Sequence, residues 1–244
     1  MEKVVELLPK AGSAYRHGWR VMSKNFISLF LVALILFVAS IPVGIFFNIS
    51  DIEPYKWGHL PLHVSHFEID KWGIMAFAVI MAQVFGLAYS IFLLSPLKYG
   101  SRLVYLKAAR NDKFEVVNMF DSFKNYLNVV LASLLSGAII AFGFFFLIIP
   151  GILFACRLAF VPFLVMDKKL DPVKAVEESW RLTKGHGWRI LWMGILAFFI
   201  IIAGFIALIF GLFISSIWIS STFASLYHAV LVEKGEYVIP NGNQ

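Results

Sequence analysis

Residues 190–232 form an apolar run that is too long to be one transmembrane helix. Only hydroxyl groups and His228 interrupt its apolar character. As a single helix it would extend about 64 Å at about 1.5 Å per residue, which is twice the hydrocarbon core of a bilayer, about 30 Å. The run must therefore cross a membrane twice, and Gly211 is the predicted turn between spans 190–210 and 212–232.

Four shorter apolar runs precede it and predict spans at residues 26–47, 74–94, 129–149 and 152–166. The composition agrees, because the 244-residue chain is 60% hydrophobic and 15% charged, with a mean hydropathy of +0.80. A soluble domain is nearer to about 45–50% apolar. The predicted fold class is all-α, an integral membrane bundle of six transmembrane helices with interfacial amphipathic helices, forming one domain over residues 1–244.

Pro150 and Gly151 separate the third and fourth spans and predict a tight hairpin turn, because proline presets one dihedral and glycine accepts positive φ. Arg157 lies about 9 Å further along the helix and is the one charged residue within a predicted span. A centrally placed arginine costs about 2.5–3.5 kcal/mol on insertion scales, so it needs compensation. The candidate partners are Gln83, hydroxyl groups of the sixth span, carbonyls near Pro162, and a lipid phosphate. Arg157 either has a structural role, in which it stabilises the packing of the helices, or forms an anion site; both interpretations stay open.

Residues 172–184 predict an amphipathic helix on the membrane surface. Asp171 is the expected N-cap and Pro172 the first helical residue, and Gly185, after Lys184, is expected to end the helix. Apolar residues at helical spacing define its expected face towards the membrane: Val173, Val176, Trp180 and Thr183. The helix is interpreted as a structural connector, with a docking surface for a partner as the alternative.

A weak internal repeat precedes the spans. Ser179-Trp180-Arg181 before the fifth span echoes Gly18-Trp19-Arg20 before the first, and residues 120–123 before the third span form a degenerate copy. We interpret the chain as three hairpins, each preceded by an interfacial helix with an aromatic anchor. Chance similarity is the rival explanation, because Trp and basic residues are favoured at membrane boundaries.

The basic residues are distributed asymmetrically between the two sides of the predicted bundle. Eighteen of the 21 Lys and Arg residues lie in the N-terminal segment, the loops at 96–124 and 168–189, and the tail, whereas the opposite side has only Lys56 and Lys71. The positive-inside rule therefore predicts that both termini are cytoplasmic. The net charge of +6 thus indicates membrane topology and not a nucleic-acid partner.

A family pattern extends over residues 95–190. It consists of Pro150-Gly151, Arg157, Pro162, Asp167, Ala175, Ser179-Trp180, Lys184-Gly185 and Trp188, with Ser95-Pro96-Leu97, Gly100 and Phe120-Asp121-Ser122-Phe123. In these residues the chain resembles the YciC-like bacterial inner-membrane proteins and their relatives, which include the membrane domain fused to some glycerophosphodiester phosphodiesterases. The resemblance implies a six-span domain of a bacterial inner membrane without a settled activity. It carries over no phosphodiesterase activity, because that soluble domain has no counterpart here.

Motifs of known chemistry are sparse. The sequence has no nucleophile elbow, P-loop, HExxH or Rossmann glycine pattern, so no catalytic residue and no cofactor is expected. His59, His63 and His66 are close enough in sequence to bind zinc or copper, but Pro61 interrupts a helix that would align them, so a metal site is disfavoured. Three polar residues share one face of the sixth span, where packing is favoured over a solute path: Ser221, Ser225 and His228.

Two functions of different classes remain open. The favoured one is a non-enzymatic inner-membrane protein that contacts the lipid bilayer and binds an anionic phospholipid or a membrane protein partner through its basic cytoplasmic face. The alternative is a transporter of a small solute or lipid, with spans four and six lining its path. The first is favoured because no Asp or Glu within a span could serve as a proton relay.

The topology gives a direct prediction. Single cysteines placed at Ser13, His59 and Asn243 should react with an impermeant maleimide in intact cells only at position 59, because only the 48–73 loop is predicted outside. Labelling at position 13 or 243 would contradict the orientation.

Overall fold

The computed structural model describes residues 11–48, 71–206 and 208–237, and these residues contain helices and no strand. Within them, six helical segments are long and apolar enough to cross a membrane: Phe26–Asn48, Ala76–Ala109, Val116–Phe146, Ile148–Asp167, Gly187–Ile206 and Gly211–Glu233. The predicted all-α class with six spans is confirmed, and the chain is a multi-pass membrane protein. The segments pair into three helical hairpins.

The first hairpin contains a second helix that is longer than predicted. After α1 (Ala11–Lys24) and α2 (Phe26–Asn48), α3 (Lys71–Tyr89) continues through the π-helical turn η3 (Ser90–Leu94) into α4 (Ser95–Ala109). The expected loop at 96–124 is therefore helical over its first half. Pro96 does not end the helix, because it follows a π-helical turn and the carbonyl of Phe92, four residues before it, accepts a hydrogen bond from the Tyr126 hydroxyl at 2.9 Å instead.

The second hairpin turns earlier than predicted. Its elements are η4 (Val116–Asn125, a 3₁₀-helix), α5 (Tyr126–Phe146), α6 (Ile148–Arg157) and α7 (Val161–Asp167). The chain reverses at Leu147, which is extended at φ −161° and ψ 154°, so the prediction of a turn at Pro150 and Gly151 is wrong. Both residues lie in the first turn of α6, where proline is well tolerated. Gly151 instead permits close packing, because a Cβ there would lie 2.5 Å from the ring of Phe144.

The third hairpin follows α8 (Pro172–Thr183) and consists of α9 (Gly187–Ile206) and α10 (Leu208–Glu233). Gly211 lies inside α10, so the prediction of a turn there is wrong: α9 ends at Ile206 and α10 begins at Leu208. The glycine that brings these helices together is Gly204, where a Cβ would lie 2.7 Å from the Gly211 carbonyl oxygen.

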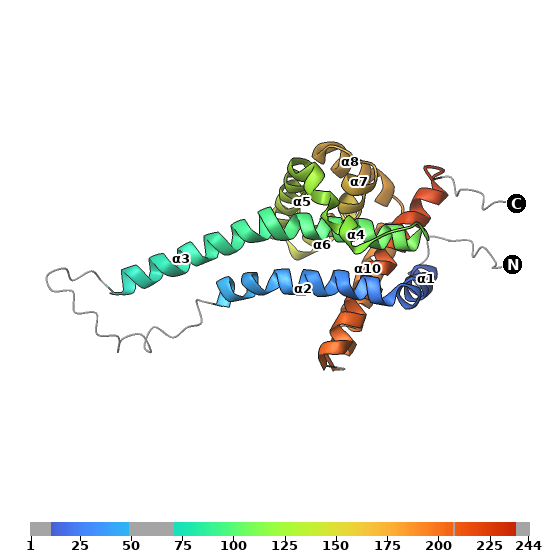
Figure 1. Cartoon of the computed structure of the whole chain (residues 1–244). Helices are drawn as coiled ribbons and strands as arrows, with labels where there is room; N and C mark the ends of the chain where they lie inside the picture. Colours follow the sequence, from blue (N-terminus) through green and yellow to red (C-terminus); the bar gives the residue numbers. More distant parts are fainter. Residues whose placement is uncertain (1–10, 49–70, 207, 238–244) are drawn as a thin grey trace, which may run out of the picture.

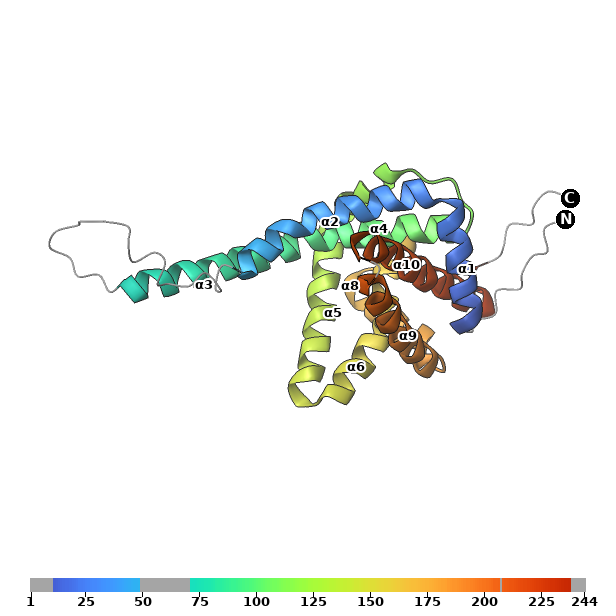
Figure 2. The same ribbon diagram turned by 90° about the horizontal axis from the view of Figure 1, so that it is seen from below.

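The three hairpins project in different directions from a shared core. Figure 1 shows α2 and α3 extending together away from the core, and Figure 2 shows α5 and α6 folding back on each other in another direction. The short helix before each hairpin packs on the second helix of another hairpin: η4 on α4, α8 on α7, and α1 on α10. The last of these contacts joins the first hairpin to the third, so the helices form a closed ring.

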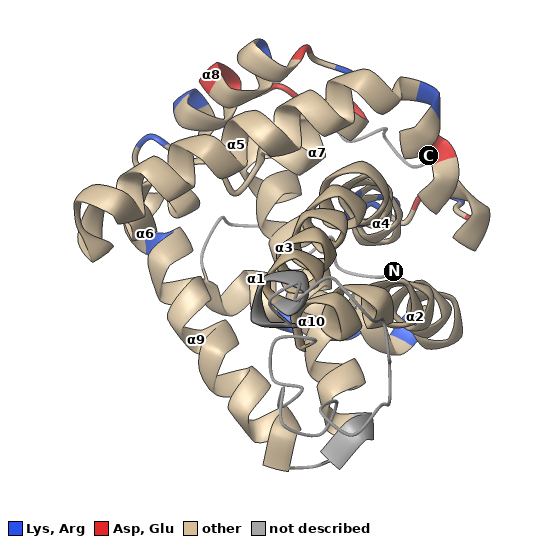
Figure 3. Ribbon diagram, turned by 90° about the vertical axis from the view of Figure 1, so that its left-hand side faces the viewer, with Lys and Arg blue, Asp and Glu red and all other residues tan. Residues whose placement is uncertain are grey.

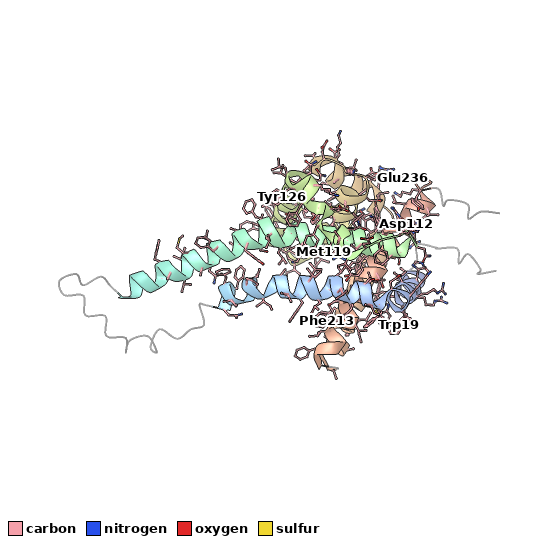
Figure 4. All side chains as sticks on the ribbon, in the orientation of Figure 1. Trp19, Asp112, Met119, Tyr126, Phe213 and Glu236 are labelled. Atoms are coloured by element: carbon pink, nitrogen blue, oxygen red, sulfur yellow. The ribbon has the colours of Figure 1, made fainter. Side chains whose placement is uncertain are left out.

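In each hairpin, the helix that follows the turn is exposed near the turn and buried further along. The last exposed apolar residues on these helices are Leu93, Leu153 and Ile214; beyond them α4, α7 and the second half of α10 are mostly buried. Exposed apolar surface on helices of this length is suited to lipid, whereas the buried parts form a protein core. Figure 4 places Trp19 and Glu236 at the core end of the molecule, opposite the free ends of α2 and α3.

Gly100 provides a test of this core. A Cβ on Gly100 would lie 1.7 Å from the carbonyl oxygen of Met119, a backbone atom of η4 that cannot move away cheaply. Gly100→Ala should therefore destabilise the protein by about 1–3 kcal/mol or more. Gly194→Ala is the matched control, because no atom lies within 4 Å of a Cβ there. In detergent, the melting temperature should fall for the first variant only; an equal effect of both would contradict the α4–η4 contact.

Candidate functional site

Arg157 lies at the end of α6, where α6 meets α8. Its main-chain carbonyl accepts a hydrogen bond from Ser179 Oγ at 2.7 Å and another from Thr183 Oγ1 at 3.4 Å. The one hydroxyl hydrogen of Thr183 is shared with the carbonyl of Ser179, which is closer at 2.8 Å, so Ser179 makes the stronger bond to Arg157. The two hydroxyl groups satisfy a carbonyl at the helix end that has no intrahelical partner, and they fix the backbone of Arg157 to α8.

The guanidinium group of Arg157 lies between α8 and the start of α9. Its Cζ is 5.6 Å from the centre of the Trp180 ring and 3.9 Å from the position of a Cβ on Gly187. Its Nε and Nη1 atoms are buried, and neither donates a hydrogen bond to any residue that the structure describes. The cation–π contact is favourable by about 0.5–2 kcal/mol, but it gives these N–H groups no acceptor.

The protein partners predicted for Arg157 bond elsewhere. Gln83 donates to the carbonyl of Phe47 at 3.4 Å. In the sixth span, Ser215 hydrogen-bonds to the carbonyls of Ile200 and Gly211, and Thr222 and Ser225 donate to carbonyls of their own helix. The carbonyls near Pro162 do not accept from Nε or Nη1 of Arg157 either, because neither atom has a partner among the described residues. For these two atoms the predicted protein partners are wrong, and a lipid phosphate remains the candidate.

The depth of Arg157 also differs from the prediction. The sequence placed it well inside the hydrocarbon core, at a distance counted from a turn at Pro150 and Gly151. In the structure it comes four residues after Leu153, the last exposed apolar residue of α6, and lies against the polar helix α8. Arg157 therefore lies at the boundary between the apolar hairpin tip and the buried core.

The other residues predicted for the site are only partly assembled around Arg157. Ser179 and Trp180 contact it, whereas Pro150 and Gly151 lie at the opposite end of α6. Lys184 and Gly185 follow the end of α8. Gly185 has a φ of +89°, in the left-handed region, which confirms its predicted role in ending the helix.

The face of α8 that is buried in the protein differs from the face predicted to lie towards the membrane. Ala175, Ser179 and Leu182 are fully buried, whereas Val173 and Trp180 are exposed. Thr183 is the one residue of the predicted face that is completely buried. The small residues allow α8 to pack closely on α5 and α7 and leave Val173 and Trp180 on the outside, where they stay predicted to face the membrane.

Sequence reasoning missed a buried ion pair that joins three helices. Arg110, at the end of α4, donates two hydrogen bonds to Asp167 at the end of α7, at 2.6 and 2.7 Å. The hydroxyl of Tyr227 on α10 donates to the same carboxylate at 3.2 Å, and the ring of Tyr237 lies 4.5 Å from the Arg110 guanidinium carbon. The ends of α4, α7 and α10 are held together by this cluster.

A second charged cluster covers α8. Glu178 and Glu236 both pair with Lys168 and Arg181; the Arg181–Glu178 distance is 2.6 Å. Figure 3 shows positive and negative segments on α8, whereas the helices α2, α3 and α5 are almost entirely uncharged. The segment after α10 is thereby fixed to α8.

The polar face of α10 is covered by another helix. Ser221, Ser225 and His228 are all buried, and Ser225 Oγ is 2.9 Å from Nδ1 of His17 on α1. This contact supports the interpretation that these residues serve helix packing.

The histidines His59, His63 and His66 lie outside the described residues. Within the residues that the structure does describe, no group of three or more His, Cys, Asp or Glu side chains could hold a metal ion. Comparison with family models, curated proteins and solved structures finds no match to this chain.

The charged cluster on α8 predicts a pH effect. The hydrogen bond from Arg181 holds the pKa of the Glu178 carboxyl below its ordinary value of 4.5. Because the pKa is lower in the folded protein than in the unfolded chain, this stabilisation is complete above about pH 4.5 and is lost as the pH falls further. The melting temperature of the native protein should thus fall more steeply below pH 4.5 than that of Glu178→Gln.

Glu177→Gln is the matched control, because Glu177 is an exposed neighbour that forms no ion pair with a described residue. It should keep the pH dependence of the native protein. An equally steep fall for Glu178→Gln would contradict the role of the Glu178 pair.

Proposed function

We propose that the chain is a non-enzymatic protein of a bacterial inner membrane that binds an anionic phospholipid through Arg157. The single observation that carries this proposal is the pair of buried N–H groups, at Nε and Nη1, without an acceptor among the described residues. A buried charged donor without a partner is costly, so a ligand that supplies acceptor oxygens is favoured at this position.

A phosphate group fits the chemistry of the site. Its oxygens accept hydrogen bonds from guanidinium N–H groups, and such charge-assisted bonds are among the stronger hydrogen bonds in proteins. Because Nε–H and Nη1–H lie on different edges of the guanidinium, one phosphate accepts from one of these two groups. Gly187 begins α9 next to the guanidinium carbon, and the first N–H groups of a helix have no intrahelical acceptor. The positive end of the α9 dipole adds to the charge of Arg157.

A lipid phosphate is favoured over a soluble anion because of the position of the site. Arg157 follows the exposed apolar residues Ile152 and Leu153, which are suited to acyl chains. On its other side lies the charged helix α8. Such a boundary is where the headgroups of a bilayer are expected.

The orientation and the family are part of the same proposal. The base-rich side, with both termini, faces the cytoplasm, in agreement with the positive-inside rule. The YciC-like pattern, which includes Arg157, Ser179 and Trp180, supports membership of that family. A solute path along the sixth span has less support, because α1 packs on the polar face of α10.

Substitution of Arg157 tests the proposal. Arg157→Gln should fold with a normal melting temperature but retain no phosphatidylglycerol at this site, as counted by native mass spectrometry after extraction in mild detergent. Arg157→Lys should retain it partially, because the charge remains and the two-pronged donor is lost. Arg16→Gln is the matched control, since Arg16 is exposed on α1. Lipid retention by Arg157→Gln equal to that of the control would refute the proposal.

A further inference from the structure

A second pair of basic residues lies on the corresponding helix of the first hairpin. Lys98 and Arg102 are four residues apart on α4, about 6 Å along the helix and on the same face. Lys98 follows Leu93, the last exposed apolar residue of its helix, by five residues, much as Arg157 follows Leu153 by four. The two hairpins therefore carry a basic side chain at the same boundary.

No acidic group of the described chain neutralises this pair. The guanidinium carbon of Arg102 lies 5.9 Å from the centre of the Phe163 ring, and neither Arg102 nor the Lys98 side chain forms a hydrogen bond or ion pair with a described residue. Like charges four residues apart on a helix repel each other. An anion that bridges the two groups would remove this repulsion.

The surroundings of the pair are open on one side only. Lys98 is the one exposed residue between positions 94 and 109, whereas Arg102 is partly buried between α4 and α7. Leu97, Tyr99 and Ser101 between them are buried in the core. Lys98 is thus the exposed member of the pair, from which a ligand can reach the partly buried Arg102.

We propose that Lys98 and Arg102 form a second site for the phosphate of an anionic lipid, so that each chain binds two such lipids. This inference rests on the function proposed for Arg157 and extends it to another hairpin. The third hairpin lacks an equivalent: four residues after Ile214 stands Trp218, whose indole N–H donates to the carbonyl of Tyr15 at 3.0 Å. The expected number of bound lipids is therefore two and not three.

Counting bound lipids in variants of the full chain tests the inference. The native protein, taken from nanodiscs of phosphatidylglycerol and phosphatidylcholine, should carry two phosphatidylglycerol molecules in native mass spectra. The double variant Lys98→Gln/Arg102→Gln should carry one, and adding Arg157→Gln should leave none. Lys113→Gln/Arg16→Gln is the matched control, because both residues are exposed, and it should keep two.

The experiment distinguishes an error in the Arg157 site from an error in the Lys98–Arg102 site. A double variant that keeps the native number of lipids overturns the second site and leaves Arg157 unaffected. If the double variant loses one lipid but Arg157→Gln keeps the native number, the lipid site proposed at Arg157 is overturned. The second site, at Lys98 and Arg102, is then retained. A bound mass of inorganic phosphate in place of lipid, lost on exchange into phosphate-free buffer, would overturn the lipid assignment.

Arg102→Met separates binding from folding. Because Arg102 forms no hydrogen bond or ion pair with a described residue, this variant should keep the native melting temperature in lipid-free detergent and still lose one lipid. A lower melting temperature under these conditions would show that Arg102 is a structural residue, and it would overturn the proposal.

Discussion

The core of this protein depends on the buried pair of Arg110 and Asp167. It joins the ends of α4 and α7 by two hydrogen bonds, and Tyr227 connects α10 to the same carboxylate. Removing one partner of such a buried pair typically costs about 3–5 kcal/mol, because the other charge is left uncompensated. The second helices of all three hairpins meet at this one carboxylate, which fixes the ends of α4 and α7 relative to α10.

The sequence predicts the spans well and the contacts between them poorly. Apolar runs of about 20 residues have few structural alternatives, which is why all six spans appear near their expected places. The turns were misplaced because Pro150 and Gly151 are equally suited to the first turn of a helix, and Gly211 is tolerated inside α10. Arg110 and Asp167 are 57 positions apart, and no local pattern in the sequence relates them.

At the candidate site, too, the sequence predicts the residue but not its tertiary contacts. Arg157 could be identified from the sequence because it is the one charge inside an apolar span. Its contacts with Ser179 and Trp180 depend on how α8 packs against α6, and small buried residues of α8 decide that packing. A basic residue at the boundary between exposed apolar and buried surface occurs in two hairpins, and it becomes visible only when burial is known.

The most direct measurement is an experimental structure of the full chain in nanodiscs that contain phosphatidylglycerol. We expect phosphate density within hydrogen-bonding distance of Nε or Nη1 of Arg157, with the acyl chains along Ile152 and Leu153. A guanidinium group that donates both hydrogens to protein atoms, or that points into acyl chains without a partner, would contradict the proposed lipid site.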